Sequence, residues 1–326
     1  MDWNMRIQAG LVALALLTCT PSSIEAHEVF VSNEQDNTIS VINIEKMEVV
    51  HTLRVGQRPR GLKLSPDGKK LFLCASDSNA IQEFDAHTYE HIRDFDDIDD
   101  PEQLAVAADG LRLYTANEDS AAVTAIDVQT REVLGRVDVG VEPEGIAVSP
   151  DGKIVAVTSE TSNMVHLIDA ATLKIADNVL VGARPRHAEF SADGKKLWVS
   201  SEIAGTVSVI DVATRTIERT VSFEVPGVTK NLITPVGIRL TKDGKKAFVA
   251  LGSANRVAVV DTQSGVVQKY ILVGIRVWHL ELTRDDKMLV TTNGGSNDVT
   301  MIDVASLSAV KSIRVGRYPW GAAARP

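Results

Sequence analysis

The sequence predicts an all-β protein, a seven-bladed β-propeller with four strands in each blade, because three markers recur along it with one period. The first marker is an apolar segment that ends in Asn or Asp, and its last residue recurs at intervals of 42, 42, 42, 42, 50 and 42 residues. The others are a proline before a short apolar stretch and an Asp-Gly pair after it. The first marker ends at Asn43, Asp85, Asp127, Asp169, Asp211, Asp261 and Asp303, the prolines are Pro59, Pro101, Pro143, Pro185, Pro235 and Pro319, and the Asp-Gly pairs begin at Asp67, Asp109, Asp151, Asp193 and Asp243.

Each repeat predicts four short strands, and residues 145–182 serve as the example. Residues 145–149 are a short apolar strand, and Ser-Pro-Asp-Gly at 149–152 is a tight turn in which proline fixes φ and glycine accepts a left-handed conformation. A second strand rich in Val and Ile covers 153–159, an alternating third strand covers 164–169, and an outer strand lies around 179–181. Four strands in a repeat of this length are typical of a propeller blade.

The two ends of the chain carry complementary parts of one repeat. The first unit starts at Val29 with its second strand, and residues 315–324 are the start of an eighth unit. We therefore expect the C-terminal strand to complete the N-terminal blade and close the ring, which leaves no unpaired inner edge there. A linear solenoid of β units is the alternative, and the complementary half-repeats disfavour it.

The first 26 residues predict a secretory signal peptide, and the propeller is expected to cover residues 27–326. Arg6 precedes an apolar run at 7–17, and small and polar residues then lead to a cleavage position after Ala26. The run is shorter than the roughly 20 residues that a membrane-spanning helix needs, and no other stretch is suited to crossing a membrane. We expect a periplasmic protein; a lipoprotein anchored at Cys19 is the alternative, which the threonine before it disfavours.

Charge and cysteine content argue against several classes of function. The formal net charge of -9 disfavours binding to nucleic acid or to anionic membranes. Loss of Cys19 with the signal peptide leaves Cys74 as a single thiol and no internal disulfide, and a fold of this size can stand on its core alone. We expect the protein to be a monomer. The sequence shows no CxxCH or CxxC motif for haem or zinc, no GxSxG and no Gly-rich phosphate loop.

The repeat resembles the YVTN-family propeller repeat. The resemblance rests on segments such as VGVEPEGIAVSPDG at 139–152, followed by a strand and by segments such as VID at 209–211. With seven units and the segment RPRHAEF at 184–190, the chain most resembles the propeller proteins associated with PQQ-dependent catabolism of alcohols. That resemblance implies a periplasmic location and suggests PQQ as a cofactor, although a fold does not by itself determine a function.

The residues on either side of the marker proline predict a binding surface at one mouth of the central channel. Numbered from the N-terminus, blades 3 and 4 carry acids there, blades 7, 1 and 2 form a cationic and aromatic sector, and blade 5 is cationic too. Arginine forks suit carboxylates and aromatic faces suit a planar ligand, so a tricarboxylate such as PQQ would fit. Solvated charges with local ion pairs are the alternative interpretation. The predicted ligand-binding residues are Arg58, Arg60, Arg184, Arg186, His187, Arg276, Trp278, His279, Tyr318 and Trp320.

Two inner strands carry His and Glu two residues apart, where most other repeats have Gly and Ala. Because residues i and i+2 of a strand face the same way, His187 and His279 should each lie in the channel beside a glutamate. Arg239, on the strand between them, would compensate these carboxylates, since charges in a narrow channel need partners. We predict such a row of ion pairs and no metal; a His/Glu metal site is the alternative. The expected members of the row are Glu189, Arg239, Glu281 and Lys63.

Two loop features belong to the same mouth. Glutamate recurs at one position of the loops between second and third strands, at Glu34, Glu118, Glu160 and Glu202, where turn chemistry is the simpler explanation. An insertion of eight residues within 222–234 either caps the mouth or is neutral.

These features favour a non-catalytic periplasmic propeller. We expect its mouth to bind a small anionic molecule or to dock a redox or transport protein, in a role accessory to PQQ-dependent alcohol catabolism. The alternative is a propeller enzyme, lactonase-like or quinoprotein-like, with His187 or His279 as the base and the arginines as an anion clamp.

Overall fold

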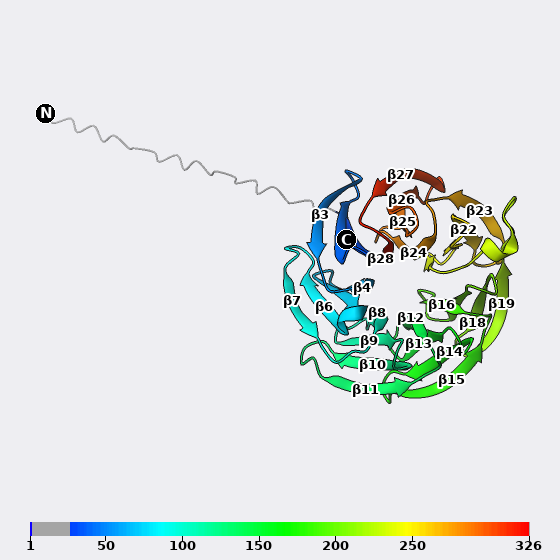
Figure 1. The fold of residues 1–326 in the computed structure, drawn as a ribbon, viewed down its shortest axis with the longest axis horizontal. Coiled ribbons are helices and arrows are strands. Elements are labelled where there is room, and N and C mark those ends of the chain that lie inside the picture. The colour runs from blue at the N-terminus through cyan, green and yellow to red at the C-terminus, as the bar shows by residue number, and fades with distance from the viewer. Residues whose placement is uncertain (2–26, 326) are drawn as a thin grey trace.

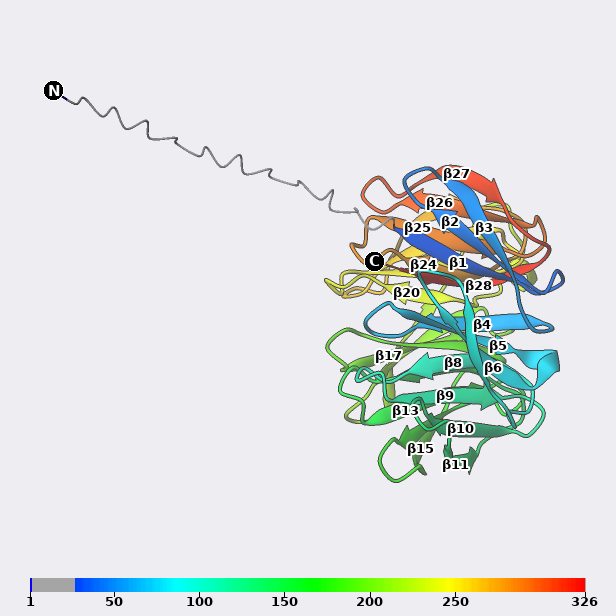
Figure 2. The ribbon, with the colours of Figure 1, turned by 90° about the vertical axis from the view of Figure 1, so that its left-hand side faces the viewer.

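A computed structural model describes residue 1 and residues 27–325, so the predicted signal peptide and Cys19 lie outside the described residues. The described residues form seven four-stranded antiparallel sheets arranged as blades around an axis, which confirms the predicted all-β, seven-bladed propeller (Figure 1). Seen from the side, the strands of blades 2 and 3 run across the ring from one face to the other (Figure 2). Among the described residues, no helix has the length and apolar character of a membrane span.

Every blade has an inner strand near the axis and three further strands outside it. Blade 1 contains β28 (Pro319–Ala324), β1 (Glu28–Asn33), β2 (Thr38–Asn43) and β3 (Glu48–Arg54). Blade 2 contains β4 (Pro59–Leu64), β5 (Lys70–Ala75), β6 (Ala80–Asp85) and β7 (His91–Phe95), with a 3-10 turn, η1 (Ser76–Ser78). Blade 3 contains β8 (Pro101–Val106), β9 (Arg112–Asn117), β10 (Ala122–Asp127) and β11 (Val133–Asp138).

The remaining blades repeat this order. Blade 4 contains β12 (Pro143–Val148), β13 (Ile154–Ser159), β14 (Met164–Asp169) and β15 (Lys174–Leu180). Blade 5 contains β16 (Pro185–Phe190), β17 (Lys196–Ser201), β18 (Thr206–Asp211) and β19 (Thr216–Ser222). Blade 6 contains β20 (Ile238–Leu240), β21 (Lys246–Ala250), β22 (Arg256–Asp261) and β23 (Val267–Leu272), preceded by a 3-10 turn, η2 (Lys230–Leu232). Blade 7 contains β24 (Val277–Leu282), β25 (Met288–Asn293), β26 (Asp298–Asp303) and β27 (Ser308–Arg314).

The hydrophobic core lies between neighbouring blades. β-Branched and aromatic residues of the middle strands face the adjacent sheets, as in other sheet-on-sheet packings. Between blades 6 and 7, for example, Phe248 and Val259 meet Leu280 and Leu289 in one buried cluster. Burying a side chain of this size contributes roughly 1.5–3 kcal/mol, so several such residues hold each pair of blades together.

The ring closes in blade 1, as the complementary half-repeats predict. Strand β28 pairs antiparallel with β1, where the two ends of the described propeller meet in Figure 1. The amide of Gly321 donates a hydrogen bond of 3.0 Å to Ser32 Oγ. Arg325 and Glu28 form a buried ion pair of 2.8 Å beyond the end of the strand. Segments almost 300 residues apart in the sequence thus share one sheet.

One face of the ring carries the residue before the marker proline, or before Val277 in blade 7. In six blades this residue has a left-handed backbone, with φ between +37 and +58°, which costs a non-glycine residue roughly 1–2 kcal/mol. In five of them its amide donates to the Oδ1 atom of an Asn that lies 21 residues earlier, at 2.8–3.0 Å. We call this the pre-proline face, and its six equivalent residues are Arg58, Asp100, Glu142, Arg184, Arg276 and Tyr318.

The opposite face, which we call the turn face, is built from the Asp-Gly turns that follow the inner strands. In blade 4, Ser149 Oγ donates to Asp151 Oδ1 at 2.7 Å, and the amide of Lys153 donates to the same carboxylate at 3.1 Å. Gly152 lies between them with φ +72°, a conformation that glycine adopts without steric cost. These short turns end the inner strands at a common level.

The insertion in blade 6 contributes apolar side chains to the core. Phe223, Val225 and Ile233 are buried in the cluster between blades 5 and 6. The amide of Glu224 donates to Tyr270 Oη at 3.0 Å. The apolar part of the insertion therefore lies between the blades.

Candidate functional site

The channel is filled by side chains just inside the pre-proline face. They stand one position after the marker proline, and all of them except the half-buried Arg60 are buried. Two indoles, four ionisable side chains and one valine therefore occupy the space near the axis that a channel mouth would need. The residues of this layer are Arg60, Glu102, Glu144, Arg186, Val236, Trp278 and Trp320.

Arg58 and Arg60 of blade 2 neutralise acids of blade 3. Arg58 contacts Glu102 at 2.5 Å and Asp100 at 3.2 Å. Arg60 pairs with the second oxygen of the same Glu102, whose side chain is completely buried, and its guanidinium carbon lies 5.5 Å from the ring centre of Trp320. One carboxylate is thus shared by two guanidinium groups.

Arg186 of blade 5 is the centre of a second charge cluster. It contacts Glu144 at 2.7 Å, pairs with Glu160, and lies 3.7 Å from Glu202. Burial and the nearby Glu160 carboxylate raise the pKa of Glu144 well above its usual range, although Arg186 opposes the shift. Burial would also raise the pKa of Glu160, but a hydrogen bond from Glu144 and the arginines lower it. We therefore expect Glu144 to hold a proton that it shares with Glu160.

Arg276 of blade 7 lies over Trp278, with its guanidinium carbon 4.1 Å from the ring centre. Its guanidinium also contacts Glu202 at 2.7 Å, and Arg186 approaches the same indole at 5.5 Å. Tyr318 lies 6.0 Å from Trp278 between ring centres. Cation–π contact and ion pairing therefore hold this indole in place.

Three carboxylates of blade 3 lie close enough together to suggest a cation site. Ligand atoms of Asp100, Glu102 and Glu118 lie within 4.8 Å of one another. However, Arg58 contacts all three, at 3.2, 2.5 and 3.6 Å, so the protein supplies a positive charge itself. Burial, together with Glu102, raises the pKa of Glu118 to about 7.

These contacts differ from the free cationic sector that the sequence suggests. Every arginine of that sector has a carboxylate partner, because the acids of blades 3 and 4 and the loop glutamates lie within reach of it. Ligand binding by this face stays a prediction. The arginines concerned are Arg58, Arg60, Arg184, Arg186 and Arg276.

The next layer inwards alternates between glycine and large polar side chains. Going round the ring from blade 2, the residues are Gly61, Gln103, Gly145, His187, Gly237, His279 and Gly321. A Cβ atom on Gly237, for example, would lie 2.8 Å from the Cα atom of His279. The glycines therefore let the neighbouring strands approach, and three large side chains share the centre.

We call the small cavity at this level the throat; it has a volume of about 20 Å³ and is lined by Gln103, His187, His279 and Trp320 among others. The rings of His279 and Trp320 lie 4.2 Å apart and those of His187 and His279 lie 5.5 Å apart, measured between centres. Burial lowers the pKa of His187 to about 4 and that of His279 well below its usual range. Both imidazoles are therefore neutral at pH 7.

Towards the turn face the channel widens into a pocket of about 400 Å³, which we call the vestibule and which is lined by Lys63, Glu189, Arg239 and Glu281 among others. Arg239 contacts Glu189 at 2.9 Å and Glu281 at 2.8 Å. Burial acts to raise the pKa of Glu189, but Arg239 overrides this effect and lowers it to about 2. A continuous row of ion pairs thus crosses blades 5, 6 and 7.

Lys63 differs from the other three members expected in that row. In the part of the chain that the structure describes, its ammonium group has no ion pair within 4.0 Å and no hydrogen bond. The equivalent position of blade 1, between blades 7 and 2 in the ring, is Ala323, which carries no charge. Burial, followed by the charge of Arg239, lowers the pKa of Lys63. Lys63 lines the vestibule, the throat and a third pocket of about 260 Å³ beside blades 3 to 5.

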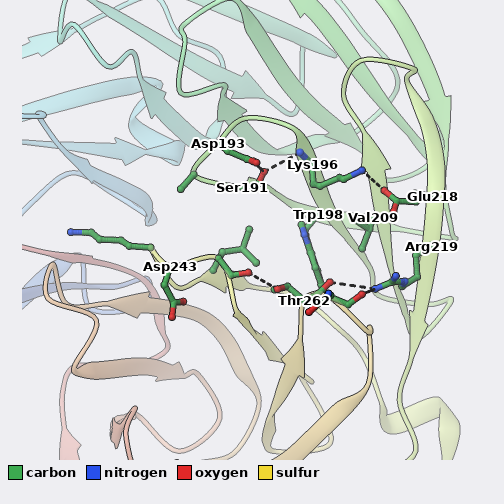
Figure 3. A pocket seen from close by; sticks show the side chains of 14 residues that line it. Ser191, Asp193, Lys196, Trp198, Val209, Glu218, Arg219, Asp243 and Thr262 are labelled. Atoms are coloured by element: carbon green, nitrogen blue, oxygen red, sulfur yellow. Dashed lines mark hydrogen bonds and ion pairs between the residues drawn. The ribbon is translucent and has the colours of Figure 1, made fainter.

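A larger pocket of about 500 Å³ lies between blades 5 and 6 (Figure 3). Its cations already have partners: Lys196 contacts Asp211 at 2.9 Å and also pairs with Glu218. Arg219 donates to the carbonyl oxygen of Gln263 at 2.9 Å. These contacts cross-link strands and leave Lys63 of the channel as the better candidate for binding an anion.

Comparison with family models supports the propeller and suggests several functional classes. A model described as YNCE-like beta-propeller matches residues 8–121, one described as Lactonase, 7-bladed beta-propeller matches residues 176–310, and one described as Cytochrome D1 heme domain matches residues 73–182. The chain is a β-propeller. Each match covers less than half of the chain, and no curated protein matches it. A haem does not fit the throat, which has room for one water-sized species.

Solved structures share the fold at low sequence identity. Hydrazine synthase of Kuenenia stuttgartiensis matches with a TM-score of 0.72 and 22% identity over 81% of this chain and 88% of that one. A functionally unknown protein from Desulfotomaculum acetoxidans matches with a TM-score of 0.79 and 14% identity, over 91% of this chain and 98% of that one. A protein from Lactobacillus plantarum matches with a TM-score of 0.79 and 16% identity, over 92% of this chain and 99% of that one. These propellers establish the architecture of the chain, and its chemistry depends on its own channel residues.

Two features of the site were missed in the sequence. Gln103 stands where most repeats have glycine, as do the two histidines. The same comparison of repeats therefore identifies Gln103 as a channel residue. The sequence favours turn chemistry for the loop glutamates, but Glu160 and Glu202 both contact the buried Arg186. Their distance in sequence from Arg186 concealed this role.

Proposed function

We propose that the protein binds a small hydroxycarboxylate in the vestibule. The observation that carries the proposal is the ammonium group of Lys63, which lines the pocket and has no hydrogen bond or ion pair within residues 27–325. A half-buried charge gains most from an oppositely charged ligand because water screens it less than at the surface. A ligand carboxylate is therefore expected at Lys63.

The acids of the vestibule indicate the rest of the ligand. Glu189 and Glu281 each contact Arg239 yet remain partly exposed, at 24% and 19% of the side chain. Since Glu189 is ionised, it can only accept hydrogen bonds, and ligand hydroxyl groups would supply the donors. Arg239 pairs with both glutamates, and Lys63 is then the vestibule cation offered to a ligand, so a ligand with one carboxylate fits better than the tricarboxylate PQQ.

A second candidate function is lactone hydrolysis, which the match of residues 176–310 to the lactonase model favours. Water would attack the lactone carbonyl carbon, the ring C–O bond would break, and the product would be a hydroxy acid, with His187 as the base. The geometry is less suitable for this step. Arg239 Nη1 lies 3.2 Å from His187 Nε2 and can only donate, and Glu189 Oε2 lies 3.7 Å from the same nitrogen. The shorter contact favours the imidazole proton on Nδ1, and the lone pair of Nε2 then accepts from Arg239 and is not available to a base.

The location and partners predicted from the sequence belong to the same proposal. We propose export to the periplasm and a monomer that is accessory to PQQ-dependent catabolism, either as a binding protein or by docking a redox or transport protein. Fractionation of cells that produce the full chain tests the location, and recovery of the protein only in the cytoplasm would contradict it.

Thermal unfolding with added ligands tests the binding proposal. Sodium gluconate should raise the midpoint of the wild-type protein, because a ligand that binds only the folded state stabilises it by about 2.7 kcal/mol at 100 times Kd. Glucose, which lacks the carboxylate, should have no such effect, and PQQ tests the resemblance directly. Lys63→Met should abolish the gluconate shift, whereas Lys242→Met, at the rim of the same pocket, should keep it. Equal shifts in both variants would overturn the proposal, and hydrolysis of gluconolactone that depends on His187 would favour the enzyme.

A further inference from the structure

The throat contains three polar atoms that have no hydrogen-bond partner among the residues that the structure describes. They are Gln103 Nε2, His187 Nδ1 and His279 Nε2, on residues that are only 4–6% exposed. All three residues line the same cavity of about 20 Å³. Leaving a buried polar group without a hydrogen bond costs about 1–3 kcal/mol, so three such groups around one cavity indicate an occupant.

The hydrogen atoms on these groups favour an acceptor as the occupant. His187 Nε2 lies 3.2 Å from Arg239 Nη1, which can only donate, and 3.7 Å from Glu189 Oε2. The shorter contact favours a neutral imidazole with its proton on Nδ1, which is the unpartnered atom. The unpartnered atom of Gln103 is its amide nitrogen, which also donates. Two donors from blades 3 and 5 therefore line one small space.

The surrounding charge disfavours a metal cation. Lys63 lines the throat without a partner, and Arg239 lines it too. Arg239, Arg186 and Lys63 all act to lower the pKa of His279, which places the imidazole in a positive field. The same field would repel a cation at His279 and would attract an anion. Glu189 lies 3.7 Å from Nε2 of His187, which is not the unpartnered nitrogen.

The size of the cavity limits the anion to a monatomic one. A space of about 20 Å³ holds one species of the size of a water molecule. A halide ion is of this order, whereas a carboxylate or phosphate group is larger. We infer that the throat is a halide site, occupied by chloride in ordinary buffers and formed by Gln103, His187 and His279. The site lies deeper than the vestibule and does not depend on hydroxycarboxylate binding there.

Bromide tests this inference, because it replaces chloride and can be located by its anomalous scattering. In crystals of the full-length protein grown in sodium bromide, we expect an anomalous peak in the throat, within hydrogen-bonding distance of Gln103 Nε2 and His187 Nδ1. In solution, bromide should quench part of the tryptophan fluorescence in a saturable way, because Trp320 lines the same cavity. Chloride should compete with this quenching, and sodium gluconate should not.

Variants separate the site from general salt effects. Gln103→Leu should abolish the saturable quenching, whereas Gln268→Leu, on the exposed outer strand β23, should leave it unchanged. If Gln103→Leu does not fold, the anomalous peak in the wild-type crystal still decides the question. Quenching that rises linearly with bromide, or a throat without an anomalous peak, would overturn the inference, even if gluconate binds to Lys63.

Discussion

The inner strand of blade 5 lies so close to blade 4 that a Cβ atom on Gly145 would be 2.7 Å from the Cα atom of His187. The same relationship recurs where Gly61 faces Gln103 and where Gly237 faces His279. Because glycine has no side chain, the next inner strand can approach closely, and its large residue at this level lies near the axis. The narrow throat and the close packing of the inner strands thus have one cause.

Gly145→Ala should destabilise the protein by about 1–3 kcal/mol, because the added methyl group overlaps backbone atoms that cannot move independently. Its Cβ would also lie 2.6 Å from the carbonyl oxygen of Arg186. Gly152→Ala is the matched control. Gly152 has open space around it but a φ of +72°. Alanine there should therefore cost only the strain of a left-handed backbone, roughly 1 kcal/mol of stability. Urea denaturation of both variants measures the difference, and an equal loss of stability would mean that the blades can separate at Gly145.

Arg239→Met should cost about 3–5 kcal/mol, because it leaves Glu189 and Glu281 unpaired in the channel. Lys196→Met provides the comparison, since Lys196 also pairs with two carboxylates, Asp211 and Glu218, but is 34% exposed. Exposed pairs contribute about 0–1 kcal/mol. Urea denaturation at pH 7 measures both, and similar costs would show that water screens the channel row as it screens the surface.

The fold could be predicted from the sequence because each blade repeats its own local signals. Proline and Asp-Gly mark the ends of every inner strand, and the strand predicted at 164–169 coincides with β14 (Met164–Asp169). The register of the repeats also placed His187 and His279 at one level of the ring. The propeller is therefore specified by short local signals that recur in each of the seven repeats.

The charge state of the site could not be predicted in the same way. Arg186 meets Glu144, Glu160 and Glu202 through the closure of the ring, and no local pattern states which acid faces which arginine. The sequence likewise suggested that Lys63 belongs to the ion-pair row. In the structure Lys63 is not part of that row, and the equivalent position of the neighbouring blade 1 is the uncharged Ala323. Which residues are neighbours around the axis is a property of the closed ring.

The structure also indicates a stabilising substitution. Ala121 has a left-handed backbone, with φ +48°, at the position where other blades have an Asn that caps the next blade. Ala121→Asn should stabilise the protein by about 1–2 kcal/mol, because asparagine tolerates this conformation and would accept a hydrogen bond from the amide of Glu142. Ala121→Gly should relieve only the backbone strain. Thermal unfolding should rank asparagine above glycine and glycine above alanine, and an asparagine variant no more stable than the glycine variant would argue against the cap.

Glu118 should make the stability of the protein fall as the pH rises from about 4.5 to 7. Its pKa in the folded protein is raised to about 7, by burial and by the neighbouring Glu102, from an ordinary value of 4.5. Between these two values the folded state keeps a proton that the unfolded state has released, so the free energy of unfolding decreases with pH and the loss is complete above pH 7. Glu118→Gln has no carboxyl proton to lose at this position. The free energy of unfolding of the variant minus that of wild type should therefore be larger at pH 8 than at pH 5.

The side chain is 34% exposed, so solvent screening keeps the effect modest. Glu90→Gln, which changes an exposed carboxylate of blade 2, controls for the change in net charge. A difference between Glu118→Gln and wild type that is the same at both pH values would mean that Arg58 keeps Glu118 ionised throughout.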